Sequence, residues 1–224
     1  MLDVLICSHR EWAIDISNNI IKTFSKKINI QNIKTPEEFH EKFLNDEKFD
    51  AILFIGWNEI IPKEITDNFL CVCLHPSLLP KYRGGSPIQH QMINCEEMSG
   101  VTIFKMDEGI DTGPIYFQKE FTLQGKNLYE VFKEIINIGT EGFNNLLDEL
   151  LNGKLLNFKQ QDETKSTYFK RRKPSESEIF YDDFENFTAE EIANKINSLL
   201  DPYPNAFIKC KDGSILYFTS AKFL

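Results

Sequence analysis

The sequence predicts an α/β fold: a Rossmann-like, mostly parallel sheet with helices on both faces, followed by a small C-terminal helix and hairpin appendage. Short apolar runs alternate with longer segments of helical periodicity, as expected for repeated β-α-β units. The runs are almost continuously apolar, which indicates strands that helices cover on both sides. A polar stretch then separates this pattern from one last helix and two short strands.

Four of the five predicted strands are apolar runs, and the second is predicted from the alternation of apolar and polar residues. The five strands cover residues 2–7, 27–32, 50–55, 70–74 and 100–106. Apolar residues at helical spacing fill most of the intervals between them. One helix start is marked clearly, because Thr35, Pro36 and Glu38 supply an N-cap, a proline at the first helical position and a capping-box glutamate.

The second half of the chain predicts how the main domain ends. A long amphipathic helix is expected over residues 128–150, and it closes a catalytic domain of residues 1–153. Residues 154–178 are polar and contain Pro174 and a run of Lys and Arg, which is typical of a connector. A small C-terminal subdomain is expected over residues 179–224.

Within that subdomain, Thr188 and Glu191 form a capping box that starts a helix. The pair Asp201-Pro202 should end it, because the residue before a proline disfavours helical geometry. Apolar residues at 207–208 and 215–218 flank a glycine-containing turn and predict a terminal hairpin.

Composition excludes several classes of protein. The 224 residues suffice for a sizeable core, and no apolar run approaches the roughly 20 residues of a membrane span, so we expect a cytoplasmic protein without membrane contact. Five scattered cysteines indicate reduced thiols and no metal site. The formal net charge of −9 disfavours DNA binding, and only residues 170–173 form a short basic cluster.

His75 is the first candidate for chemistry, because it directly follows the predicted strand at residues 70–74. Ligands of such sheets gather at the carboxyl ends of the strands. A single histidine in this place is more often structural than catalytic. Asp111, in the loop after the next strand, favours the catalytic interpretation, because a carboxylate beside an imidazole fixes its tautomer and favours its protonated form.

Two further loops follow strands. Residues 81–87 form a glycine-containing turn before a helix, so Arg83 and the backbone amides could hold an anion, although an ordinary strand-to-helix loop explains the composition equally well. Residues 56–62 could line a pocket that accepts an aromatic ring, but this signal is weak by itself.

Taken together, residues 74–84 and 100–113 resemble the signature of the folate-dependent formyltransferases. Members of that family use 10-formyltetrahydrofolate and share a catalytic trio of Asn, His and Asp. The resemblance assigns His75 to proton transfer from the attacking amine, and Asp111 to orienting and polarising it. Cys73 stands where the family has its asparagine, and it is the third catalytic candidate. A thiol is a weaker hydrogen-bond donor than an amide.

The resemblance also implies the ligand contacts. The expected co-substrate is 10-formyltetrahydrofolate, with no metal. The residues expected at the folate are Gly56, Trp57, Ile61, Pro62, Met106, Asp107, Gly109 and Ile110. Those expected at the acceptor are Ser77, Arg83 and Gly84.

For the acceptor, residues 168–174 and 201–207 resemble sugar-modifying members of the family, which implies a nucleotide-linked amino sugar and a role in lipopolysaccharide biosynthesis. A methionyl-tRNA formyltransferase-like enzyme, a folate-binding protein without turnover, and a hydrolase that releases formate remain alternatives. Apolar residues at 215–218 and 223–224 also suggest a homodimer.

Overall fold

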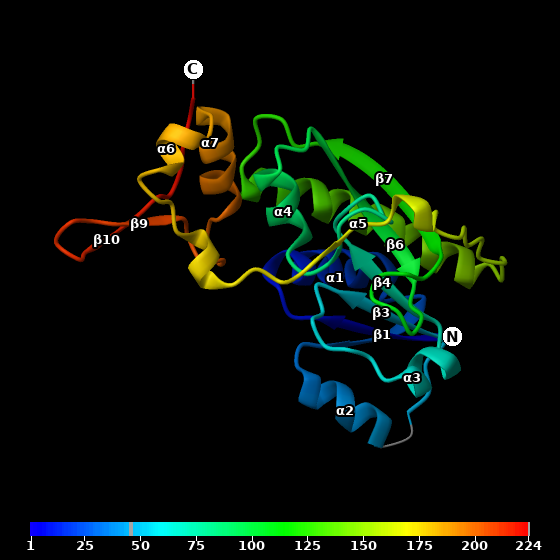
Figure 1. The fold of residues 1–224 in the computed structure, drawn as a ribbon. Helices are drawn as coiled ribbons and strands as arrows, with labels where there is room; N and C mark the ends of the chain where they lie inside the picture. The colour runs from blue at the N-terminus through cyan, green and yellow to red at the C-terminus, as the bar shows by residue number, and fades with distance from the viewer. Residues whose placement is uncertain (45–46, 224) are drawn as a thin grey trace.

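The computed structural model describes residues 1–44 and 47–223, and its centre is a six-stranded sheet in the order β2-β1-β3-β4-β6-β7 (Figure 1). The strands are β1 (Leu2–Ser8), β2 (Ile28–Ile33), β3 (Ala51–Ile55), β4 (Cys71–His75), β6 (Met98–Lys105) and β7 (Ile115–Thr122). The pairs β1–β2, β1–β3 and β3–β4 are parallel, whereas β4–β6 and β6–β7 are antiparallel. The predicted mostly parallel α/β sheet is thereby confirmed.

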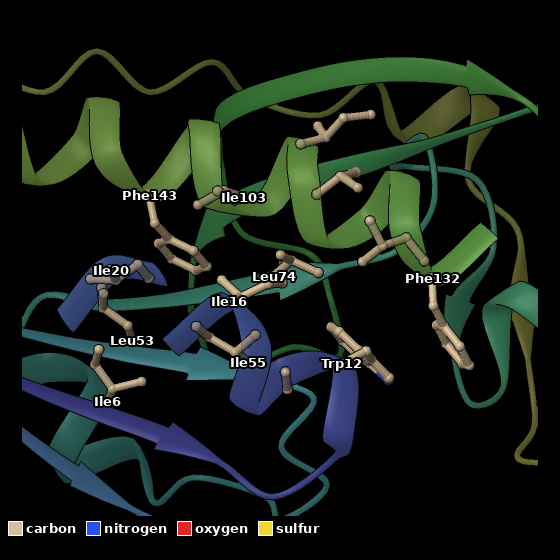
Figure 2. Packing of buried hydrophobic residues seen from close by; sticks show 14 of the residues in the cluster. Ile6, Trp12, Ile16, Ile20, Leu53, Ile55, Leu74, Ile103, Phe132 and Phe143 are labelled. Carbon is tan, nitrogen blue, oxygen red and sulfur yellow. The ribbon is translucent and has the colours of Figure 1, made fainter. Parts of the chain in front are cut away.

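Helices cover both faces of this sheet. Helices α1 (Glu11–Phe24) and α5 (Leu128–Leu151) pack on one face, and α2 (Pro36–Leu44) and α3 (Lys63–Asn68) lie on the other (Figure 1). In β1, Val4 and Ile6 face the first pair while Leu5 and Cys7 face the second. Each fully buried Leu, Ile or Phe contributes about 1.5–3 kcal/mol, so both faces stabilise the sheet. Figure 2 shows the larger core beneath α5.

Caps fix where the helices begin. Thr35 accepts a hydrogen bond from the amide of Glu38, and α2 begins at Pro36 as predicted. Asn127 caps α5 in a capping box with Glu130. Such caps satisfy amides that have no partner inside the helix, and each contributes about 1 kcal/mol.

The polar connector, residues 154–178, runs back along the main domain instead of spanning open solvent. It contains two 3₁₀ turns, η1 (Glu163–Lys165) and η2 (Pro174–Ser177), and the short strand β8 (Tyr168–Phe169). Strand β8 pairs in parallel with β5 (Arg83–Gly84), which directly follows the His75 loop. Sequence periodicity gave no sign of this two-residue pairing.

The last part of the chain has its own small core. It contains α6 (Asp183–Asn186), α7 (Ala189–Ser198), β9 (Phe207–Lys209) and β10 (Ile215–Tyr217). The predicted capping box of Thr188 and the terminal hairpin are both confirmed. Ile179, Ile196, Leu199 and Ala206 form the core, and α7 packs against α4 (Pro87–Ile93) of the main domain (Figure 1).

The homodimer expected from the sequence stays a prediction, because the apolar side chains of β10 are exposed in the single chain. Ile215, Leu216 and Tyr217 are each about half exposed, and Leu224 lies outside the described residues. The proposed boundaries at residues 153 and 178 likewise stay predictions. Among the described helices, none is long and apolar enough to cross a membrane.

Candidate functional site

His75 is held at the end of β4 with one ring nitrogen already engaged. The ring is 6% exposed, and its Nε2 atom lies 2.7 Å from the carbonyl oxygen of Tyr82. A carbonyl only accepts, so Nε2 carries the proton of the neutral ring. The other nitrogen, Nδ1, therefore keeps its lone pair and lies 3.4 Å from Oδ2 of Asp111. His75 is thus oriented as a base.

Asp111 is fixed from two sides. Its Oδ2 accepts a hydrogen bond from the amide of Gly84 at 2.8 Å, and its carbonyl oxygen accepts one from Gln161 Nε2 at 2.9 Å. Its backbone is left-handed, with φ at 56°, a conformation that aspartate tolerates better than most residues. Such strained residues gather at functional sites. The structure therefore brings the two predicted catalytic residues together.

Cys73 is on the same strand, two residues before His75, and lines the same cleft. Burial, with the negative charge of Asp111 adding to it, raises the pKa of the Cys73 thiol well above its usual value. The thiol therefore stays protonated near neutral pH, and it is a weak S–H donor and a poor nucleophile.

These residues line a cleft of about 550 Å³. We call one side the strand-end wall; it is built from Gly56–Ile60, Cys73–Pro76, Ile110 and Asp111. The opposite side, the connector wall, is built from Tyr168, Arg171, Arg172 and Pro202–Pro204. The starts of α1 and α4 complete the lining with Arg10, Trp12 and residues 84–89.

Four side chains of this lining carry buried nitrogen atoms with no hydrogen-bond partner among the described residues. They are Trp12 Nε1, Trp57 Nε1, Gln89 Nε2 and Arg172 Nε. All four are donors, and an unpaired buried donor costs about 1–3 kcal/mol. The cleft is therefore suited to a ligand rich in hydrogen-bond acceptors.

The connector lies directly against Gly84, the last residue of β5, and against Gly85, which follows it. A Cβ atom on Gly84 would lie 2.3 Å from the carbonyl oxygen of Phe169, and one on Gly85 would lie 2.4 Å from the backbone of Arg171. The amide of Arg172 also donates to Ser86 Oγ. Only glycine allows this close approach.

The residues predicted at the folate divide into two groups. Gly56, Trp57 and Ile110 line the cleft. The other predicted residues are outside its lining: Ile61, Pro62, Met106, Asp107 and Gly109. Ile61 packs in the core beside α2 and α3, and the Asp107 carboxylate accepts hydrogen bonds from the Gly109 amide and the Thr112 hydroxyl. These residues shape the loops that carry the lining.

The predicted acceptor contacts need a correction. Arg83 is buried, and its guanidinium donates to both carboxylate oxygens of Glu163 and to Gln161, so it holds the connector and is not free for an anion. Ser77 is fully buried and donates to the carbonyl oxygen of Lys81, which stabilises the loop. Gly84 does line the cleft.

Sequence reasoning missed Arg10, Trp12, Gln89 and Tyr203 as lining residues. A signal existed for Arg10, which follows the end of the first strand, as site residues of such sheets do. Tyr203 lies in the segment 201–207 whose resemblance to sugar-modifying members pointed to the acceptor, whereas Gln89 gave no signal. Among residues 1–44 and 47–223, no group of three or more His, Cys, Asp or Glu side chains could hold a metal ion.

Comparison with known proteins identifies the fold and its relatives. Residues 5–133 match the protein family described as formyl transferase. Methionyl-tRNA formyltransferase from Campylobacter lari strain RM2100 is 37% identical over 199 residues, which cover 83% of this chain and 61% of that protein. The chain therefore spans about three-fifths of the length of this curated relative.

Solved structures extend the likeness over the whole chain. Methionyl-tRNA formyltransferase from Clostridium thermocellum has a TM-score of 0.78 and 32% identity, with 97% of each chain covered. A sugar N-formyltransferase from Shewanella sp. FDAARGOS_354 has the same TM-score at 21% identity and covers 100% of this chain and 99% of its own, which shows a shared fold. The family resemblance and the fold class expected from the sequence are confirmed.

Proposed function

The chain belongs to the formyl transferase family, and from this premise we propose that it transfers a formyl group from 10-formyltetrahydrofolate to a primary amine. The observation that carries the proposal is the pair of His75 and Asp111. Their 3.4 Å contact lies in the cleft, and the tautomer of His75 is fixed by the Tyr82 carbonyl oxygen.

The folate supplies the formyl carbon, and the residues of the chain manage the protons. As the amine nitrogen bonds to that carbon it must lose a proton, and His75 Nδ1 is placed to accept it. The Asp111 carboxylate then stabilises the imidazolium. The same proton returns to the folate nitrogen as its bond to the formyl carbon breaks, so the transfer is balanced.

The chain supplies a weak donor where a negative charge develops on the formyl oxygen. The S–H group of Cys73 lies on the strand-end wall, and Gln89 Nε2 is a second, unpartnered donor in the cleft. Losing one good donor for such an oxygen costs about 100- to 1000-fold in rate. We therefore expect slow turnover.

The strand-end wall fits the folate. Gly56 to Ile60 offer backbone groups and the Trp57 indole, whose N–H is buried and unpartnered, and Ile110 adds an apolar surface that is 53% exposed. A flat ring with acceptor atoms matches these groups. These groups match the flat ring of the folate and not the rest of that molecule.

For the acceptor, methionyl-tRNA is the first candidate. The Campylobacter lari and Clostridium thermocellum relatives, at 37% and 32% identity, are both named methionyl-tRNA formyltransferases. They support this acceptor better than the nucleotide-linked amino sugar expected from the sequence. Arg10, Arg171 and Arg172 line the cleft, so a phosphate could pair with them.

A nucleotide-linked amino sugar is the second candidate, favoured by charge. The net charge of −9 repels a long polyanion, whereas a single diphosphate needs only the local arginines. Burial lowers the pKa of Arg172 from its usual value, and the carboxylate of Glu176 opposes this only in part, so a phosphate bound in the cleft would stabilise the charged guanidinium.

Formyl transfer from labelled 10-formyltetrahydrofolate tests the proposal. The acceptors are methionyl-tRNA and a panel of nucleotide-linked amino sugars, with a sample lacking acceptor alongside. Labelled methionyl-tRNA supports the first candidate, and a labelled sugar supports the second. Formate release without acceptor indicates a hydrolase, and folate binding without any transfer indicates a binding protein; either result contradicts the proposal.

A further inference from the structure

A second cavity of about 250 Å³ adjoins the catalytic cleft. Arg10, Trp12, Pro202 and Tyr203 line both cavities, so they form the boundary between the two. We call the second cavity the aromatic annex. Its aromatic lining consists of Trp12, Tyr129, Phe132 and Tyr203. The formyl transfer proposed above uses none of these rings.

The rings of the annex form an ordered row. The Trp12 and Phe132 rings lie 6.1 Å apart and nearly parallel, at 12°, and Phe132 and Tyr203 follow at 6.1 Å and 27°. Figure 2 shows Trp12 on α1 and Phe132 on α5 at the same end of the core. Tyr129, on the first turn of α5, is 48% exposed. The exposed ring of Tyr129, which lines the annex together with this row, is a surface on which another flat ring can stack.

Charge gives the cleft and the annex different preferences. The cleft carries Arg10, Arg171 and Arg172, which attract phosphate. The annex carries the carboxylates of Glu11, Asp15 and Asp201 beside Arg10 and Lys133. Carboxylates disfavour phosphate and accept hydrogen bonds from amino groups.

From this arrangement we infer that the aromatic annex binds the nucleobase of the acceptor, with a preference for a base that carries an exocyclic amine. The phosphate then lies at the arginines and the reacting amine at His75. The buried N–H of Trp12, unpartnered in the described structure, is a further donor beside the shared wall. The inference rests on the proposed function only in assuming that the acceptor contains a nucleotide.

Binding of free mononucleotides to the full chain tests it without turnover. Calorimetry compares AMP, IMP, which lacks the amine, and ribose 5-phosphate, which lacks the base. We expect AMP to bind at least tenfold more tightly than ribose 5-phosphate, and more tightly than IMP. Equal affinity for AMP and ribose 5-phosphate would overturn the inference. CMP and GMP, tested against AMP, distinguish a nucleotide-linked sugar from the terminal adenosine of a tRNA.

Variants localise the binding. Tyr129→Ala should weaken AMP about tenfold and leave ribose 5-phosphate unchanged, and Asp15→Asn should remove the preference for AMP over IMP. The matched controls are Tyr217→Ala, an exposed tyrosine of β10, and Asp148→Asn, an exposed aspartate near the end of α5. Controls that weaken AMP as much as the annex variants do would place the base elsewhere.

The result of the nucleotide-binding test can be distinguished from the result of the formyl-transfer test. If formyl transfer fails with every acceptor but AMP still binds through its base, the annex stands and the proposed function falls. If transfer succeeds while free nucleotides show no dependence on the base, the proposed function stands and the annex inference falls.

Discussion

The two walls of the cleft differ in how the chain makes them. The strand-end wall consists of residues at the ends of neighbouring strands. The sheet itself brings His75 Nδ1 and Asp111 Oδ2 to 3.4 Å from each other. The connector wall is made by a segment that returns from beyond α5 and is held by the two-residue pairing of β8 with β5, together with Pro202–Pro204 from the C-terminal part of the chain. The first wall carries the proposed chemistry, and the second carries charge and rings for the acceptor. Chemistry and acceptor choice can therefore be altered separately.

The largest effect should come from the strand-end wall. We expect His75→Ala to lower kcat/KM for formyl transfer by about 10²- to 10⁴-fold, because the attacking amine loses its base. Asp111→Asn should also act mainly on kcat, since asparagine keeps the left-handed backbone and the acceptor for Gly84 but loses the charge. Steady-state kinetics measure both. His40→Ala, an exposed histidine of α2, is the control, and near-normal turnover in His75→Ala would contradict the mechanism.

A gain of function should come from the same wall. Cys73→Asn introduces an amide donor where the partly buried, protonated thiol is a weak donor, so kcat should rise by up to about 100-fold. Cys73→Ala should lower kcat by no more than about tenfold. A much larger loss in the alanine variant would show that the thiol takes part in the chemistry. Single-turnover rates separate this step from product release.

A smaller effect, limited to the acceptor, should follow from moving the connector wall. Gly85→Ala places a Cβ atom where the Arg171 backbone lies 2.4 Å away, so the connector must shift and carry Arg171 and Arg172 with it. We expect KM for the acceptor to rise about tenfold while kcat changes little. Gly153→Ala is the matched control, because a Cβ atom added at this left-handed position would have no heavy atom of another described residue within 4 Å, apart from its chain neighbours. An unchanged KM would show that the connector wall does not bind the acceptor.

The same contrast explains what the sequence could predict. Continuous apolar runs predict β1, β3 and β4, and alternation predicts β2; His75 and Asp111 follow apolar runs, so their meeting could be foreseen. Strand β7 was missed because only one of its eight residues, Phe121, is fully buried, which leaves little periodicity. The contact of Arg83 with Glu163 could not be foreseen because the two residues lie 80 positions apart, and no local pattern reveals such a contact. Long-range pairing of short segments is decided by tertiary packing.

The smallest expected effect concerns His9, which lies behind the cleft lining, beside Trp57 of the strand-end wall. Its ring contacts the Trp57 ring edge-on at 5.8 Å. Burial lowers the pKa of His9, the positive charges of Arg10 and Arg171 lower it further, and Glu59 partly opposes them. The fold therefore favours neutral His9, and the unfolded chain binds more protons below its ordinary pKa of 6.5.

It follows that the free energy of unfolding should decrease as pH falls from 6.5 through the lower pKa of folded His9. His9→Gln cannot take up that proton, so its stability should depend less on pH over this range. Urea unfolding at several pH values measures the slope, and the difference between the two proteins at pH 8 gives the packing cost alone. Parallel slopes would mean that burial and the charges of Arg10 and Arg171 do not lower the pKa of His9. A shallower slope in His9→Gln that Gly85→Ala reproduces would instead show that Arg171 imposes the effect across the cleft.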